Sequence, residues 1–343
     1  MTAPQLRPEK RRPAVMEDVA RLAGVSYQTV SRVLNDSPKV RADTRERVLA
    51  AIRQLDYRPN SVARALATGR SKTLGVVSFD TTLYGPASTL LGIERAAHDA
   101  GYGVSVSSLH SLNRGTVLAA IQQLRDQGVD GVVVIAPLRA GVDALRHLRT
   151  DVAVVAVAAG PNESIPVASI DQMAGAAAAT RHLLSLGHKT VWHLAGPNDW
   201  KEAEERIEGW RSVLQAVGAP LPALLRGDWT ARSGYELGQN LLEIPEVTAV
   251  FAANDQMALG LLRRLHEAGR EVPRDLSIVG FDDIPEAAYF TPPLTTIRQD
   301  FTDLGRRCLY ALLARIEGEA GPTRVVVAPE LVVRGSTVAP PKR

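Results

Sequence analysis

Apolar residues follow two different rhythms along this 343-residue chain, and the change of rhythm divides it. Between residues 15 and 58, apolar positions recur every three or four residues, which predicts short amphipathic helices. Beyond Lys72, short apolar runs alternate with helical stretches, which predicts alternating strands and helices. The sequence therefore indicates a small all-α head followed by a large α/β core.

The head is expected to hold two short helices joined by a tight turn, and then a third helix at about 42–55. Gly24 ends the first helix, because glycine accepts the left-handed conformation found there, and Ser26 is placed to cap the second helix. The side chains expected to pack inward are Val19, Ala20, Ala23, Val30, Val33, Leu34, Val48, Ile52 and Leu55.

The core is expected to form parallel sheets covered by helices on both faces, because strands and helices alternate in it. The pattern runs twice, which predicts two similar halves with a cleft at the carboxyl ends of their strands. Strands are expected at 74–79, 104–108, 131–135, 152–158, 191–195, 249–252 and 276–281, with helices near 86–100 and 116–127.

Charge is unevenly divided between the two parts. Residues 1–70 carry 14 Lys or Arg and 7 Asp or Glu, a balance of +7, whereas the rest carries 26 and 30, a balance of −4; together they give the net +3. A basic head on a mildly acidic body suits a protein whose head meets a polyanion. Residues 1–13 alone are also consistent with a basic disordered tail.

Composition and motifs exclude several protein classes. The single cysteine, Cys308, cannot form an internal disulfide, and no apolar stretch approaches the ~18 residues that span a bilayer. No apolar run follows the basic N-terminus, so we expect no signal peptide and a soluble cytoplasmic protein. Because the sequence lacks a phosphate-binding loop, a dinucleotide fingerprint, a serine-hydrolase elbow and clustered metal ligands, we predict no cofactor, no metal and no enzyme activity.

The second helix of the head carries polar side chains of the kind that read DNA. A recognition helix places its first turns in the major groove, where Gln pairs with adenine and Arg with guanine. Tyr27, Gln28 and Arg32 are the expected base contacts. Hydroxyl-bearing residues expected to bond phosphates are Ser26, Thr29 and Ser31. Taken alone, this face is also consistent with an ordinary solvated helix.

The runs DVARLAGVSYQTVSRVLN (18–35) and VRADTRERVLAAIRQLDYRPNSVARAL (40–66) resemble the LacI/GalR family of bacterial transcriptional repressors. Tyr27, Gln28 and Arg32 match base-reading positions of that family. The resemblance implies that 59–70 is a hinge helix that folds on DNA, with Asn60 among its contacts and Leu66 as an apolar wedge in the minor groove. A plain linker, with Leu66 packed on the core, is the alternative.

The core carries the same resemblance in LAGP (194–197), GDWTARSGYE (227–236), VFAANDQMALG (250–260) and IVGFDDIPEAAYFTPPLTTIRQDF (278–301). It implies a periplasmic-binding-protein-like core of two lobes with parallel sheets and three crossovers. The implied division is a disordered tail at 1–14, a helix-turn-helix domain at 15–58, a hinge at 59–70 and a core at 71–337. Lobe one takes about 71–169 and 299–321, and lobe two about 170–298 and 324–334.

The resemblance also implies a sugar site between the lobes. Arg206, Asn254 and Asp282 match polar contacts to a sugar, and Trp229 matches an aromatic ring that lies on the sugar face. Charged side chains and one stacking ring suit a polyol, which has hydroxyls and apolar C–H faces. Structural roles remain alternatives: a surface ion pair with Glu202 for Arg206, a helix cap for Asn254, its own loop for Asp282 and the core for Trp229.

Departures from the family pattern bear on specificity and assembly. Ala158 stands where a sugar-contacting aspartate is found in the family. Phe79, Tyr84 and Pro86 are expected to line the matching loop of lobe one, with aromatic residues at 79 and 84, so the sugar is expected to differ from a simple galactoside. The chain ends without an apolar heptad tail, so we expect a homodimer and a palindromic operator.

The implied function is a sequence-specific repressor of sugar-utilisation genes, released from its operator DNA when a galactoside or other glycoside binds between the lobes. A regulator that binds DNA only when its small molecule is bound is an alternative, in which the small molecule strengthens DNA binding instead of weakening it. A sugar-binding protein without a DNA role is a second alternative, which the attached head argues against. A sugar-converting enzyme is a third, and no residues support it.

Overall fold

The computed structural model describes residues 14–34, 37–57, 69–111, 113–145, 148, 150–158 and 165–341. The chain divides into two compact units after Ser71. Within the described ranges, no helix has both the length and the apolar character needed to cross a membrane. The expected hinge contacts Asn60 and Leu66 lie outside the described residues.

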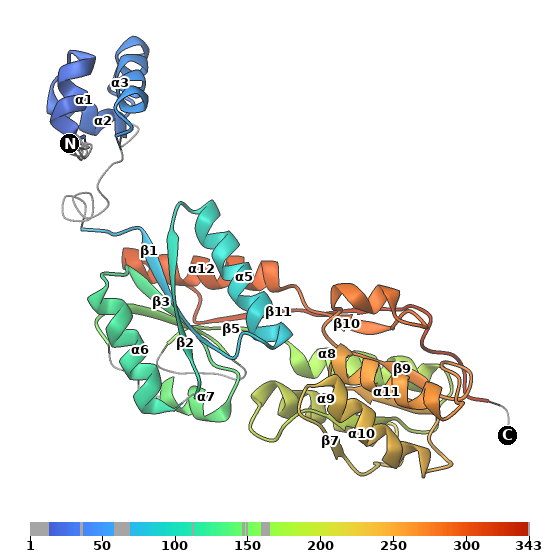
Figure 1. The fold of residues 1–343 in the computed structure, drawn as a ribbon. Helices are drawn as coiled ribbons and strands as arrows, with labels where there is room; N and C mark the ends of the chain where they lie inside the picture. The colour runs from blue at the N-terminus through green and yellow to red at the C-terminus, as the bar shows by residue number, and fades with distance from the viewer. Residues whose placement is uncertain are drawn as a thin grey trace, which may run out of the picture. The chain divides into compact units, whose positions relative to one another are not determined.

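The described part of the first unit holds three helices (Figure 1): α1 (Met16–Ala23), α2 (Tyr27–Leu34) and α3 (Ala42–Gln54). Gly24 ends α1 with a left-handed φ of 64°, and the Ser26 hydroxyl accepts a 3.2 Å hydrogen bond from the Thr29 N–H and so caps α2. Both predictions are confirmed. The small core between the helices buries Val19, Ala20, Ala23, Val30, Val33, Val48, Ala51 and Tyr57.

Lobe one of the second unit is a six-stranded parallel sheet in the order β11-β5-β4-β3-β1-β2. Its helices α5 (Tyr84–Asp99) and α12 (Phe301–Glu317) cover one face, and α6 (Arg114–Asp126) and α7 (Arg139–Leu145) cover the other (Figure 1). Its strands are β1 (Thr73–Phe79), β2 (Gly103–Leu109), β3 (Gly131–Ile135), β4 (Ala153–Val157), β5 (Val167–Ile170) and β11 (Arg324–Val327).

Lobe two repeats the design with a four-stranded parallel sheet in the order β7-β6-β8-β9. Helices α8 (Gln172–Ser185) and α9 (Lys201–Ala216) pack on one face, and α10 (Ala231–Leu242) and α11 (Asp255–Glu267) on the other. The strands are β6 (Trp192–Ala195), β7 (Leu225–Arg226), β8 (Ala249–Ala252) and β9 (Ser277–Val279). The expected arrangement of two α/β lobes with parallel sheets is confirmed.

The chain passes between the lobes three times: from β5 to α8, from β10 (Thr296–Arg298) to α12, and from β11 to β12 (Glu330–Val332). The expectation that the last strand region belongs to lobe two is wrong for β11, which pairs with β5 in lobe one. The reason is that α12 packs on the sheet of lobe one, so the strand that follows it returns to the same sheet. Only β12 continues onward, pairing antiparallel with β10.

Candidate effector site and DNA-reading helix

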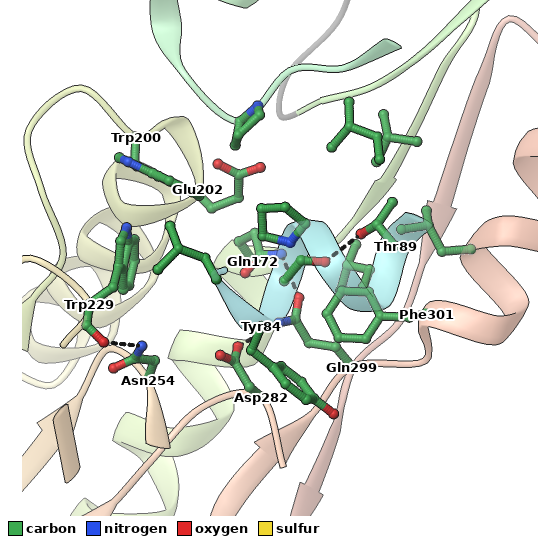
Figure 2. Close-up of a pocket in the computed structure, with 18 of the residues that line it drawn as sticks. Tyr84, Thr89, Gln172, Trp200, Glu202, Trp229, Asn254, Asp282, Gln299 and Phe301 are labelled. Atoms are coloured by element: carbon green, nitrogen blue, oxygen red, sulfur yellow. Dashed lines mark hydrogen bonds between the residues drawn. The ribbon is translucent and has the colours of Figure 1, made fainter. Parts of the chain in front are cut away.

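A cavity of about 340 Å³ lies where the strand ends of the two lobes face each other (Figure 2). This volume falls in the range of small-molecule sites. Lobe one contributes mainly apolar side chains to its lining, among them Pro86, Ile135, Pro137, Val157 and Ala158. Lobe two contributes mainly polar ones, among them Glu202, Arg206, Asn254, Gln256 and Asp282, together with Trp200 and Trp229.

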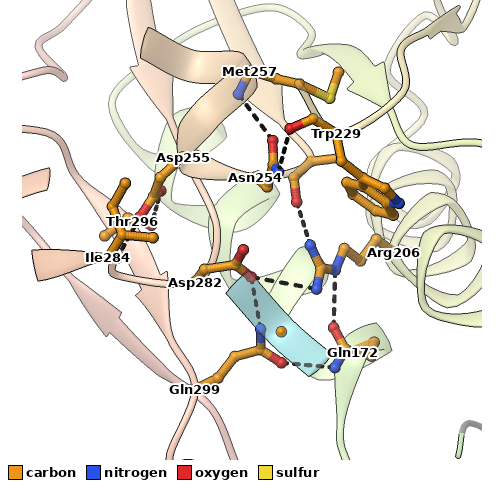
Figure 3. Close-up of polar contacts among 12 residues, drawn as sticks. Gln172, Arg206, Trp229, Asn254, Asp255, Met257, Asp282, Ile284, Thr296 and Gln299 are labelled. Atoms are coloured by element: carbon orange, nitrogen blue, oxygen red, sulfur yellow. Dashed lines mark hydrogen bonds and ion pairs between the residues drawn. The ribbon is translucent and has the colours of Figure 1, made fainter. Parts of the chain in front are cut away.

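A closed ring of polar contacts lies at one side of this cavity (Figure 3). Arg206 Nε donates to Gln172 Oε1 at 2.9 Å, and Gln172 Nε2 donates to Gln299 Oε1 at 2.8 Å. Gln299 Nε2 donates to Asp282 Oδ1 at 2.7 Å, and Arg206 Nη2 lies 3.5 Å from the same oxygen. All four side chains are buried. Each therefore fixes the orientation of the next, as a preorganised binding site requires.

Arg206 is a buried member of this ring and not a surface residue paired with Glu202. It is only 5% exposed, its guanidinium lies 3.8 Å above the Phe281 ring, and Nη1 donates to the Ala253 carbonyl. Burial raises the pKa of Asp282 to about 6, and the nearby Arg206 charge limits the rise. The backbone of Asp282 has a φ of 112°, which a non-glycine residue adopts at a cost that is common at functional sites.

Asn254 has the structural role that the cap alternative assigned to it, and it also lines the cavity. Its Oδ1 accepts a 2.9 Å hydrogen bond from the Met257 N–H at the start of α11, and its Nδ2 donates to the Trp229 carbonyl at 2.9 Å. Asn254 thus ties the Trp229 backbone, whose φ is 73°, to the start of α11. A Cβ at Gly196 would overlap the Trp229 indole, so the glycine of the LAGP run makes room for the ring.

On α2, the three expected base contacts lie on the face opposite the buried Val30 and Val33. Tyr27 is 52% exposed, and Gln28 and Arg32 are also exposed. The expected phosphate contacts are less free than the base contacts. The Ser26 and Thr29 hydroxyls lie 3.0 Å apart, within hydrogen-bonding distance, and the Ser31 and Thr29 side chains are half-buried. The DNA contacts themselves stay predictions.

Comparison with known proteins identifies the kind of molecule. The model "Bacterial regulatory proteins, lacI family" matches residues 15–60, and "Periplasmic binding protein-like domain" matches 180–337. The lactose operon repressor of Escherichia coli (strain K12) is 37% identical over 332 residues, covering 96% of this chain and 92% of the repressor. The chain belongs to the lacI family. Like its relatives in that family, it is a DNA-binding transcriptional regulator and not a member of an enzyme family.

Solved lacI-family structures agree with this fold. A lac repressor dimer bound to operator and the anti-inducer ONPF is 35% identical, with a TM-score of 0.84 over 96% of this chain and 100% of that one. The transcriptional regulator CelR in complex with cellobiose is 34% identical, with a TM-score of 0.69 over 94% and 99% of the two chains.

The lobe-one side of the site differs from expectation at one position. Tyr84 and Pro86 line the cavity, and the Tyr84 ring meets Phe301 edge to face at 5.9 Å. Phe79 is not among the described residues of the lining; it packs against the apolar cluster beneath α6 and α7 instead. The pleat of β1 explains this, because side chains two residues apart share a face and Val77 packs in the same cluster.

Several cavity residues escaped the sequence analysis. Gln172 and Gln299 lie at the first and second crossovers, 127 positions apart, and join only when both lobes have folded. Nothing in their immediate sequence distinguishes them from ordinary helix-flanking glutamines. The sequence predicts Glu202 only as an alternative partner for Arg206, although its position one helical turn before that arginine places it in the same cavity.

Proposed function

We propose that this protein is a cytoplasmic, dimeric repressor of sugar-utilisation genes, without enzyme activity, and that a glycoside held between the lobes releases it from a palindromic operator. The observation that carries the proposal is the ring of Arg206, Gln172, Gln299 and Asp282. These side chains offer hydrogen bonds of the kind that a sugar needs, and Gln172 and Gln299 lie on two of the segments that connect the lobes.

The composition of the ring supports the choice of a sugar. Guanidinium, carboxylate and carboxamide groups offer both donors and acceptors to hydroxyls. The rings of Trp229 and of the partly buried Phe301 offer apolar surface to C–H faces. The lac repressor and CelR structures carry the small molecules ONPF and cellobiose, which fits a small glycoside here as well.

The lobes also meet directly at a second place, away from the crossovers. The Arg139 N–H donates to the Asp199 carbonyl at 2.9 Å, and the Lys201 N–H donates to the Pro137 carbonyl at 3.0 Å. Arg139 also forms an ion pair with Glu204. A ligand that bonds to both walls of the cavity favours this closed arrangement, and it can shift DNA affinity only by its differential affinity for the closed and open forms.

The direct test uses the full chain and a DNA fragment from upstream of its own gene, in a mobility-shift titration with and without a panel of mono- and disaccharides. We expect a specific complex that at least one glycoside dissociates. A glycoside that tightens the complex would support the alternative of opposite sign. No preference for the promoter fragment under any condition would contradict the proposal.

The reading helix is tested by Arg32→Ala. Loss of one bidentate base contact should cost about 1–3 kcal/mol of binding free energy and relax the base preference at one operator position. Arg53→Ala, at an exposed arginine in the last turn of α3, is the matched control and should leave the base preference unchanged. Selection from a randomised operator library measures both, and an unchanged preference for Arg32→Ala would exclude α2 as the reader.

A further inference from the structure

Three buried polar atoms at the cavity have no hydrogen-bond partner among the described residues: Glu202 Oε2, Trp229 Nε1 and Gln256 Oε1. A buried polar atom without a partner costs free energy, so such atoms gathered at one cavity indicate groups that a ligand supplies. Glu202 is the most informative of them, because a buried carboxyl costs more than an indole or an amide.

Glu202 lies on the same wall as the polar ring but at a separate position. It precedes Arg206 by four residues on α9, so the two side chains project from one face of the helix about 6 Å apart along its axis. Figure 2 shows its carboxyl in the cavity beside Trp200, across from the Tyr84–Asp282 side. Both groups line one cavity of about 340 Å³, so a ligand whose first sugar unit contacts Arg206 and Asp282 can reach Glu202 with a further unit.

We propose that Glu202 contacts a hydroxyl on a second sugar unit, so that the effector of this protein is a disaccharide-class glycoside and not a monosaccharide. This inference rests on the proposed function. Trp200 and Trp229, whose rings meet edge to face at 5.5 Å beside Glu202, supply the apolar surface on which the second unit lies.

A hydroxyl fits this position better than an amine. Burial raises the pKa of Glu202 to about 8, although its own backbone N–H, Arg206 and Lys201 oppose the rise, so the carboxyl is mostly neutral at pH 7. A neutral carboxyl donates one hydrogen bond and accepts another, which matches a hydroxyl. An ammonium group would need the ionised carboxylate and would sit one helical turn from the Arg206 guanidinium.

Isothermal titration of the full chain with matched ligand pairs tests this inference. Each pair joins a disaccharide with the methyl glycoside of its non-reducing sugar: cellobiose with methyl β-glucoside, lactose with methyl β-galactoside, and maltose with methyl α-glucoside. We expect one disaccharide to bind about tenfold or more tightly than its methyl glycoside, and Glu202→Leu to remove most of that ratio. Glu202→Gln, which keeps a donor and an acceptor, should restore part of it.

Glu208→Leu is the matched control, since Glu208 lies on the same helix, is exposed and pairs with Arg211 outside the cavity. It should leave the ratio at the wild-type value. The inference is overturned if no disaccharide is preferred over its methyl glycoside, if Glu202→Leu keeps the full ratio, or if a diamino disaccharide (di-glucosamine) binds more tightly than cellobiose. Binding of no sugar at all would overturn the proposed function, and this inference with it.

Discussion

The two lobes bring opposite chemistry to one cavity. The wall from lobe one is mainly apolar, with aliphatic side chains, prolines and the rings of Tyr84 and Phe301, whereas the wall from lobe two carries a buried arginine, two carboxyls and an asparagine. Both lobes have the same parallel α/β design, so the difference comes from the residues that line the cavity and not from the fold. Under the proposed function, this comparison predicts that lobe two selects the ligand by hydrogen bonds, while lobe one covers the ligand.

The position of Ala158 strengthens this contrast. A small apolar residue stands there, at the end of β4, and is 5% exposed. An aspartate at that position would put a polar contact on lobe one. In this chain the additional carboxyl that lines the cavity is Glu202 on lobe two, so both cavity carboxyls, Glu202 and Asp282, belong to that lobe.

Arg206→Ala should break the contrast most severely. It leaves the Asp282 carboxyl buried without its cationic partner, which should lower the free energy of unfolding by about 3–5 kcal/mol and abolish sugar binding. Urea unfolding and isothermal titration, under conditions where the variant is folded, measure the two effects. A variant that binds sugar like the wild type would place the effector elsewhere.

The control for that variant is Arg211→Ala on the same helix. Arg211 is partly exposed and pairs with Glu208 at 2.9 Å. Exposed ion pairs contribute little, so this change should alter stability by less than about 1 kcal/mol and leave sugar binding intact.

Glu202→Gln should change how the free energy of unfolding depends on pH, because the buried Glu202 carboxyl is replaced by a group that does not titrate. Glu202 has a pKa near 8 in the folded protein and 4.5 as its ordinary value, so between these pH values the folded state binds more protons than the unfolded state. Wild-type stability from this group therefore falls as pH rises through that window. The variant lacks the effect, so its advantage should grow from pH 5 to pH 8 by roughly 3–4 kcal/mol.

Urea unfolding of both proteins at the two pH values measures this difference. Besides its own backbone N–H, the groups that act on Glu202 are Arg206, Glu205 and Lys201, all on α9 and all retained in the variant. Glu208→Gln is the exposed control and should follow the wild-type profile. Parallel profiles for wild type and Glu202→Gln would show that the carboxyl is already satisfied in the folded protein.

The same contrast explains what the sequence could predict. The apolar runs of Gly131–Ile135 and Ala249–Ala252 match the strands residue for residue, because a strand buried on both faces has apolar residues at consecutive positions. Arg206, Asn254, Trp229 and Asp282 do line one cavity, as the family resemblance implied.

Local sequence patterns do not predict contacts between segments that are far apart in the chain. Gln172 and Gln299 join the site only because two crossovers meet, and no local pattern encodes that meeting. The prediction that Phe79 lines the cavity is wrong, because one aromatic residue at a strand end does not reveal on which face of the sheet its side chain lies. β11 was assigned to the wrong lobe because its partner, β5, is about 150 residues earlier, and strand pairing over that distance depends on how α12 returns the chain.

Leu83→Ala should sharpen the contrast with the smallest effect. Leu83 belongs to lobe one, is half-buried, and packs against the apolar cluster of lobe two as well as lining the cavity. Truncation should remove about 1 kcal/mol of apolar burial from the closed form and weaken every sugar about fivefold. The ratio between a disaccharide and its methyl glycoside should not change, since the polar groups on lobe two are untouched. Leu118→Ala, at an exposed leucine on α6, is the control for isothermal titration of both ligands. A changed ratio in Leu83→Ala would mean that lobe one also selects the sugar, and the division of labour between the lobes would fail.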